Sequence, residues 1–185
     1  MAGGLHTAGS QSVVTFVQLS SAAATYFAWG LSLEPEHRSR LGLADGQPAR
    51  LDKHRLVYTA TSPAWRGRVG AVLPVAGHQV EGLLFTLEPE RFAKVEAFER
   101  EQGGLRTTVS VITTGGPVSA QIFSPAPQRV GGPVDEAWIA ALLRGLAQAK
   151  VSADYLQART AEALILERVQ AVTPAAPRAW NPTCP

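Results

Sequence analysis

Cysteine is almost absent from this sequence: Cys184 is the single one among 185 residues. A disulfide framework is therefore excluded, and so is a zinc site built from several cysteines. Histidine is also scarce. The four histidines lie at positions 6, 37, 54 and 78, and they show none of the short spacings, such as i and i+4, that place two metal ligands on one helix face. We expect neither a metal ion nor a cofactor.

Charge of either sign is limited, at 17% of the residues, and the net charge is only +2. No block of Lys and Arg is interleaved with aromatic residues, so nothing indicates nucleic-acid binding. No apolar run is long enough to span a bilayer. The N-terminal region lacks the basic segment with which a secretory signal begins. We expect a cytoplasmic protein that acts on a small-molecule substrate and binds neither nucleic acid nor a membrane. The pattern predicts no particular oligomeric state.

What is present is the composition of a globular protein, with 45% hydrophobic residues, and a length that suits one domain with a proper core. Residues 1–11 are rich in Gly and Ser, and we expect them to be flexible. Residues 12–172 are predicted to form the single domain, and residues 173–185 a Pro-rich tail. An apolar, β-branched run at residues 12–19 is a candidate strand.

Alternating apolar and polar residues predict strands in the middle of the chain. We expect them at residues 24–30, 49–61, 68–75 and 78–87, followed by a hairpin at residues 105–125 that turns at Gly115-Gly116. Helices are predicted at residues 32–42 and 88–101. Because strands do not alternate with helices, the pattern favours an α+β fold over a doubly wound α/β fold.

Two further helices are predicted to close the domain. In the first, Trp138, Leu142 and Leu146 form a stripe with helical spacing. The second begins after a plausible N-cap, Ser152. Its Leu156, Leu164 and Val169 are expected to face inward.

One carboxylate stands out on the helix predicted at residues 88–101. On a helical wheel Glu99 falls between Phe92 and Val95, on the stripe that should face the core. Glu is rarely buried unless it is paired, so Glu99 could lie at the edge of the stripe in a pair with Arg100 or Arg106. The alternative is that Glu99 lines a pocket and carries out chemistry.

Common site motifs are absent. The chain has no G-x-S-x-G nucleophile turn, no phosphate-binding G-x-x-x-x-G-K-[ST] loop and no G-x-G-x-x-G after a strand. What it has is a strand that runs directly into a glycine loop, YFAWGLSL, at residues 26–33. Such a loop exposes backbone N–H groups that can bind an anion.

These two features together carry a resemblance to a known family. YFAWGLSLEPEHRSRLG, at residues 26–42, resembles the opening of the gamma-glutamylcyclotransferase-like family, whose first strand typically reads Phe-Ala-Tyr-Gly-Ser-Asn-Leu. VEGLLFTLEPERFAKVEAFERE, at residues 80–101, resembles the family's strand followed by a helix that ends in Leu-Asp-x-x-Glu-Gly. The family's catalytic Glu falls on Glu99, with Glu96 in place of the Asp. The likeness covers roughly residues 24–157.

The resemblance implies a mixed β-barrel-like sheet with short helices and two C-terminal helices, and a pocket at the end of the first strand. In that pocket the backbone of Gly30, Leu31 and Ser32 would hold the α-carboxylate of the substrate. Glu99 would act as general acid and base while the α-amine attacks the γ-amide carbonyl and 5-oxoproline is released. No metal or cofactor takes part.

Several positions differ from the family pattern. Trp29 replaces Tyr, Leu31 replaces Ser, Ser32 replaces Asn, and Arg100 follows Glu99 where Gly is usual. Tyr is also frequent in the family near Leu105 and at Phe123, where this chain has apolar residues. The expected substrate-binding residues are Trp29, Gly30, Leu31, Ser32, Leu105 and Phe123.

Two alternatives remain open. The first is a tailoring enzyme of secondary metabolism that performs an acid/base cyclisation or elimination on a larger, more apolar substrate. The second is a non-catalytic binding protein on the same fold, which a solvated Glu99 paired with Arg100 or Arg106 would favour.

Overall fold

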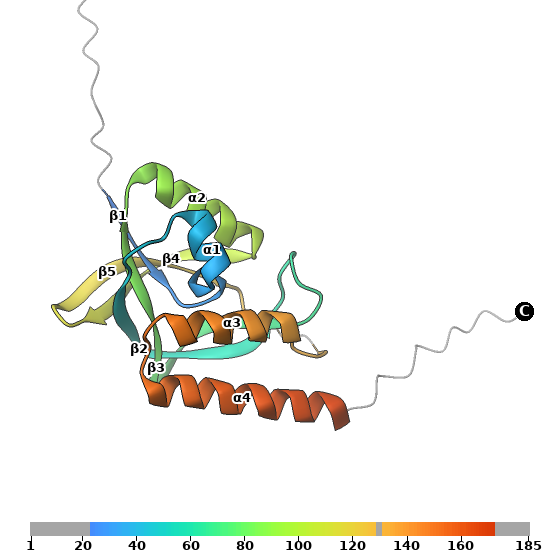
Figure 1. The fold of residues 1–185 in the computed structure, drawn as a ribbon. Coiled ribbons are helices and arrows are strands. Elements are labelled where there is room, and N and C mark those ends of the chain that lie inside the picture. The colour runs from blue at the N-terminus through green and yellow to red at the C-terminus, as the bar shows by residue number, and fades with distance from the viewer. Residues whose placement is uncertain (1–22, 129–130, 173–185) are drawn as a thin grey trace, which may run out of the picture.

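The computed structural model describes residues 23–128 and 131–172 (Figure 1). The candidate strand at residues 12–19, the N-terminal segment 1–11 and the tail 173–185 lie outside the described residues. Five strands and five helical segments follow one another in an α+β order, as predicted. The strands are β1 (Ala24–Ala28), β2 (Gln47–Ala60), β3 (Val69–Leu87), β4 (Gly104–Thr113) and β5 (Gly116–Pro125). The helical segments are η1 (Leu31–Leu33, a 3-10 turn), α1 (Pro35–Leu41), α2 (Pro89–Glu101), α3 (Glu136–Gln148) and α4 (Ala153–Val172).

The strands close into a barrel in the order β1-β3-β2-β4-β5. β1 is antiparallel to β3 and parallel to β5, which it meets at Tyr26 and Gln121. On the other side of the barrel β2 meets β4 at Arg50 and Ile112. The single parallel pairing makes this a mixed sheet, which agrees with the predicted fold class.

The two strands predicted at residues 68–75 and 78–87 are one strand, β3. Pro74 and Gly77 are residues typical of a break between strands, and Gly77 does adopt a left-handed φ of 79°. β2 nevertheless pairs with both sides of this irregularity, through His54 with Pro74 and Asp52 with Gln79. The residues between bulge out of the ladder, and the strand continues because its long partner spans the bulge.

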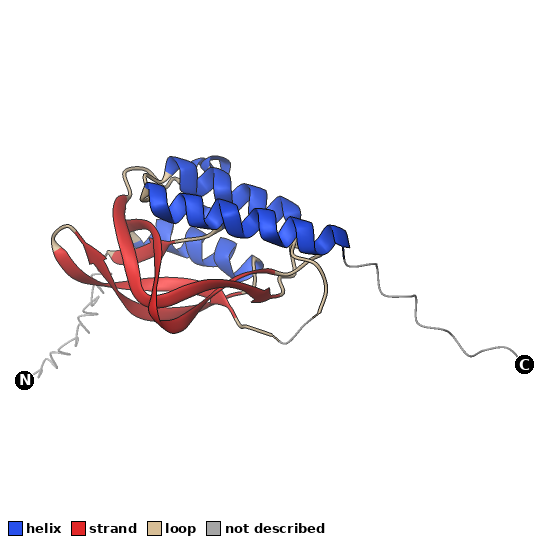
Figure 2. Cartoon of the chain, turned by 90° about the horizontal axis from the view of Figure 1, so that it is seen from below, coloured by secondary structure: helices blue, strands red, loops and turns tan. Residues whose placement is uncertain are grey.

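The helices cover one side of the barrel (Figure 2). The predicted stripe of α3 is confirmed, since Trp138, Leu142 and Leu146 are all buried. The N-cap of α4 is also confirmed, because the Ser152 hydroxyl accepts a hydrogen bond from the Tyr155 N–H at 3.2 Å.

The predicted inner face of α4 is only partly correct. Leu156 packs against the core, but Leu164 and Val169 are 51% and 57% exposed. Apolar residues lie on more than one side of this helix, so the sequence pattern did not define a single buried face. None of the described helices is both long enough and apolar enough to cross a bilayer.

The turn after β1 is held in place by α3. Glu34, which is buried, accepts a hydrogen bond from the His37 N–H as the N-cap of α1, and its carboxylate pairs with Arg144 of α3 at 3.2 Å. α3 approaches closely because position 145 is glycine. A Cβ on Gly145 would lie 2.9 Å from the backbone of Leu33 and Glu34. The loop is therefore fixed from behind by a packed helix.

Candidate functional site

Glu99 lies near the end of α2, on the side that faces the barrel. The helix begins at Pro89, whose missing N–H costs nothing at that position, and it buries Val95 and Phe98. Its end is pressed against the hairpin of β4 and β5. A Cβ on Gly104 would lie 2.8 Å from the Glu99 carbonyl oxygen, so only glycine permits this approach. Backbone packing thus fixes the position of the Glu99 main chain, from which its side chain extends.

The Glu99 carboxylate is held by a short chain of hydroxyl groups. The Tyr26 hydroxyl of β1 donates a hydrogen bond to Glu99 Oε1. The same Tyr26 oxygen lies 2.6 Å from the hydroxyl of Ser32, which is fully buried in η1. A phenol has one proton to donate, so the bond to Glu99 leaves Ser32 as the donor to Tyr26. The chain runs from Ser32 through Tyr26 to Glu99.

Burial raises the pKa of Glu99 to about 7. The hydroxyl groups of Tyr26 and Ser32 act in the opposite direction, because hydrogen bonds donated to a carboxylate favour its ionised form. Burial and the nearby carboxylate raise the pKa of Tyr26 well above its usual value, so this phenol stays a neutral donor. A carboxyl group with a pKa near 7 can accept and return a proton at neutral pH.

The two arginines considered as partners for Glu99 pair with Glu96 instead. Arg100 Nη2 lies 2.8 Å from Glu96 Oε1, and Arg106 Nη1 lies 3.5 Å from Glu96 Oε2. Glu96 therefore forms the solvated ion pairs at the edge of the helix. Glu99 is bonded to a phenol and keeps the raised pKa that a guanidinium partner would lower.

The loop after β1 passes beside this carboxylate. The Trp29 indole N–H donates a hydrogen bond to the Phe123 carbonyl at 2.8 Å, which ties the loop to β5. A Cβ on Gly30 would meet no atom within 4 Å, so the space in front of its backbone is open. Leu31 and Ser32 begin η1, and the N–H groups at the start of a helix have no partner within it.

A small cavity of about 20 Å³ joins the loop to Glu99. That volume holds about one water molecule. Its walls are mostly apolar, with Gln102 the one other polar side chain. The lining residues are Trp29, Gly30, Leu31, Val69, Gly70, Glu99, Gln102, Pro125 and Trp138.

The structure brings most of the predicted site residues together. Trp29, Gly30, Leu31 and Glu99 share this cavity, and Ser32 reaches Glu99 through Tyr26. Leu105 and Phe123 lie outside it.

The expectation that Leu105 lines the pocket disagrees with its position, since its side chain is 57% exposed on β4. Phe123 is buried in the core, where its ring packs against those of Tyr26 and Phe92, and its backbone carbonyl anchors Trp29. In the β4–β5 hairpin Leu105 pairs with Ser124 and Arg106 with Phe123, so Leu105 and Phe123 lie on opposite faces of the sheet.

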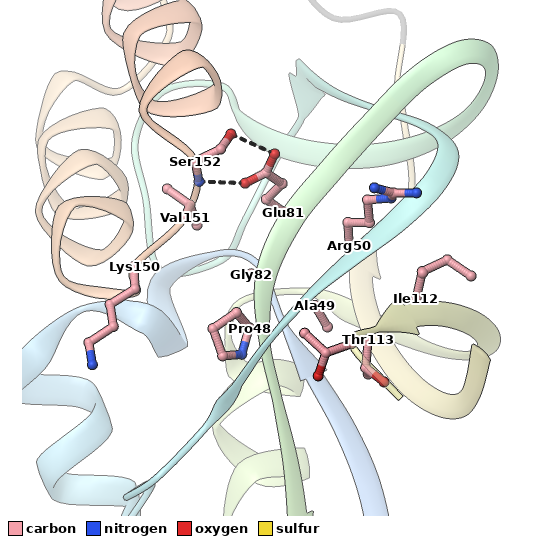
Figure 3. Close-up of a pocket in the computed structure, with 11 residues that line it drawn as sticks. Pro48, Ala49, Arg50, Glu81, Gly82, Ile112, Thr113, Lys150, Val151 and Ser152 are labelled. Carbon is pink, nitrogen blue, oxygen red and sulfur yellow. Dashed lines mark hydrogen bonds between the residues drawn. The ribbon is translucent and has the colours of Figure 1, made fainter. Parts of the chain in front are cut away.

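A larger groove of about 490 Å³ lies elsewhere, between β2, β3, the end of β4 and the link from α3 to α4 (Figure 3). Its one carboxylate, Glu81, already accepts hydrogen bonds from the backbone N–H and hydroxyl of Ser152, at 2.7 and 2.8 Å. Arg50 and Lys150 lie on opposite sides of the groove in Figure 3. The groove therefore presents no acid–base pair, and its size alone does not make it the reaction centre.

Within residues 23–128 and 131–172, no three side chains among His, Cys, Asp and Glu gather closely enough to hold a metal ion. The cavity next to Glu99 contains one carboxylate, one amide and two indole rings. Its chemistry fits proton transfer rather than metal ligation.

Tyr26 is the site residue that sequence reasoning missed. It lies within the quoted strand, but an aromatic residue in a buried strand is typical of a core position. No local signal identifies it, because Glu99 lies 73 residues away in the chain and only the closed barrel brings the two side chains together.

Comparison with protein families gives one match. The model of the family described as "Gamma-glutamyl cyclotransferase, AIG2-like" matches residues 26–140, which is more than half of the chain. The matched segment contains the end of β1, the glycine loop and Glu99. No curated protein sequence matches the chain significantly.

Solved structures share the fold. A structure described as a gamma-glutamyl cyclotransferase has a TM-score of 0.63 at 18% identity, covering 79% of this chain and 99% of its own. An uncharacterized human protein has a TM-score of 0.65 at 18% identity, covering 76% and 88%. A yeast cyclotransferase described as specific to glutathione has a TM-score of 0.58 at 13% identity, covering 78% and 97%. At these identities the likeness establishes the fold alone.

Proposed function

The chain belongs to the gamma-glutamyl cyclotransferase, AIG2-like family, and from this premise we propose that it is a cofactor-independent enzyme that cyclises a γ-glutamyl amide and releases 5-oxoproline. Glu99 serves as its general acid and base. The observation that carries the proposal is a carboxyl group with a pKa near 7 at the wall of the glycine-loop cavity.

The first step is proton transfer from the substrate to Glu99. The α-carboxylate of the substrate approaches the open backbone of Gly30 and the N–H groups at the start of η1. Glu99 accepts a proton from the α-ammonium group, and the freed amine attacks the γ-carbonyl carbon. Closing a five-membered ring within one molecule gains much of the rate advantage of proximity.

The second step breaks the amide bond. Glu99 returns its proton to the departing nitrogen as the C–N bond breaks. The ring nitrogen loses its second proton, which Glu99 also relays, and the amine leaves as an ammonium ion. Two protons thus pass from the α-nitrogen to the leaving nitrogen, so the reaction balances without a cofactor. Tyr26 holds the Glu99 carboxylate in position throughout.

The test is Glu99→Gln, which keeps the shape of the side chain and removes its titration. We expect turnover of a γ-glutamyl amide to fall at least about a hundredfold, with the thermal unfolding curve still cooperative. The matched control is Glu96→Gln on the same helix, which loses only the solvated pairs with Arg100 and Arg106. Near-full activity of Glu99→Gln would show that the assignment is wrong.

A second candidate concerns the substrate. The cavity walls are formed by Trp29, Leu31, Val69 and Trp138, which favour apolar surface, and burying such surface contributes roughly 25 cal/mol per Å². The apolar lining favours a tailoring reaction, cyclisation or elimination, on an apolar molecule, and the cavity of about 20 Å³ must widen to admit either substrate.

The two candidates differ in substrate preference. We expect kcat/KM for a γ-glutamyl amide with a large aromatic leaving amine to exceed that for γ-glutamyl-alanine at least about tenfold. Equal or better values for the small dipeptide would mean that these walls do not contact the leaving group. Cyclisation of a bulky chain that contains no γ-glutamyl unit would favour the second candidate.

A further inference from the structure

α4 carries three exposed large apolar residues: Leu164 lines a groove beside α3, whereas Ile165 lies on the outer side of the helix. Leu164, Ile165 and Val169 are 51%, 61% and 57% exposed, and they make up three of the four large hydrophobic residues in the described chain that are exposed to this extent. The opposite side of α4 packs on the domain through Tyr155, Leu156 and Leu166. α4 lies at the edge of the molecule in Figure 1, with no described element beyond it.

The exposed side of α4 has the spacing of a helix–helix seam. Asp154, Ala158, Ala161, Ile165 and Arg168 follow one another at alternate intervals of four and three residues, and all five are exposed. This alternation keeps residues on one line along a helix, as in the seam of a two-stranded coiled coil. The two alanines at its centre let a second helix approach closely, and Ile165 supplies apolar bulk.

The charges at the two ends of this seam are opposite. Asp154 stands in the first turn of α4 and Arg168 in the second-last, and neither has an ion-pair partner among the described residues. An antiparallel second copy of α4, related by a twofold axis beside Ala161, brings Asp154 opposite Arg168 and Ala161 opposite its own copy. Twofold symmetry forms each contact twice. A parallel copy would instead oppose like charges.

We propose that α4 is the interface of a homodimer in which two copies of this helix pack antiparallel along the Asp154–Arg168 seam. The proposal is independent of the catalytic assignment, because the segment that matches the family model ends at residue 140, before α4. The seam residues are also separate from those that line the Glu99 cavity.

The first experiment measures the mass of the full chain in solution by sedimentation equilibrium and light scattering. We expect a dimer at micromolar concentration. Ile165→Glu replaces the one large apolar residue of the seam with a carboxylate in each copy, and it should raise the dimer dissociation constant at least about a hundredfold. Its circular dichroism should match that of the parent chain.

The matched control is Leu105→Glu, which makes the same kind of change at the fourth exposed large hydrophobic residue, on β4. It should leave the dimer intact. A parent chain that is monomeric at tens of micromolar would overturn the proposal. A dimer that dissociates in Leu105→Glu and persists in Ile165→Glu would overturn it as well.

The second experiment tests the antiparallel direction. Asp154→Arg and Arg168→Asp, each alone, place like charges at both ends of the seam and should weaken the dimer about tenfold or more. Mixing the two variants should restore association as a heterodimer, because each Arg then faces an Asp. Failure of the mixture to associate more tightly than either variant alone would overturn the antiparallel arrangement.

Discussion

The Tyr26 hydroxyl controls both the position and the proton affinity of Glu99. It donates to the carboxylate, and this bond lowers a pKa that burial alone would raise further. Glu99 must be ionised to accept the proton of the substrate, so activity falls as the pH drops below its pKa. The hydroxyl therefore extends activity towards lower pH.

Tyr26→Phe removes this donor and should raise the pKa of Glu99 above about 7. The acid limb of the kcat/KM profile should then move to higher pH, while the rate at high pH changes less. The control is Tyr58→Phe, because the Tyr58 hydroxyl is buried without a hydrogen-bond partner in the described structure. Tyr58 lies on β2, and its ring packs against Trp138 without itself lining the cavity. An acid limb that stays in place, or moves to lower pH, would exclude this role.

At the same scale, helical periodicity placed Glu99 on the core-facing stripe between Phe92 and Val95, and the family resemblance then assigned it the catalytic role. Tyr26 could not be selected in the same way. It is 73 residues from Glu99 in the chain, and only the closed barrel brings the two together. The exposure of Leu105 escaped prediction for a related reason, since family likeness aligns positions but does not fix which face of β4 turns towards the cavity.

Among the elements, α3 acts as the support for the glycine loop. Glu34 is tied to Arg144, and the absence of a side chain at Gly145 lets the backbone of Leu33 and Glu34 lie directly on the helix. Because Gly145 approaches backbone atoms rather than the flexible end of a side chain, the loop has little room to adjust at that point. Changes in α3 should therefore be felt at the cavity.

Gly145→Ala tests this support. The new Cβ would lie 2.9 Å from backbone atoms of Leu33 and Glu34, so η1 or α3 must move. We expect a net loss of about 1–3 kcal/mol in the free energy of unfolding, measured in urea, although Ala favours a helix more than Gly does. Gly131→Ala, whose Cβ would meet nothing within 4 Å, is the control. Equal stability of the two variants would contradict the support role.

Element types were easier to predict from the sequence than their breaks and faces. The helix over α2 and the buried stripe of α3 were predicted because a proline start and a regular period mark each one. The bulge in β3 was mistaken for a break, since Pro74 and Gly77 look the same in either case. The buried face of α4 was misassigned because its apolar residues surround the helix.

For the whole molecule, composition and the order of elements were enough to indicate an α+β domain. Barrel closure was not predictable from local patterns, because it depends on one parallel contact between Tyr26 and Gln121 and one antiparallel contact between Arg50 and Ile112. Neither contact leaves a local signal in the sequence. The family resemblance predicted a barrel-like sheet, and the structure defines which residues pair to close it.

Barrel closure also constrains the order of events while the chain is being made. Trp29 and Phe123, which the indole hydrogen bond joins, are 94 residues apart. At roughly 5–20 residues per second, a ribosome needs about 5–20 s to add that stretch. Throughout this interval β1 has emerged without β5, and its backbone groups on that edge are satisfied only by water. A nascent chain that ends before β5 would contain both Glu99 and the glycine loop without the strand that fastens them, so catalytic competence should be acquired late in synthesis.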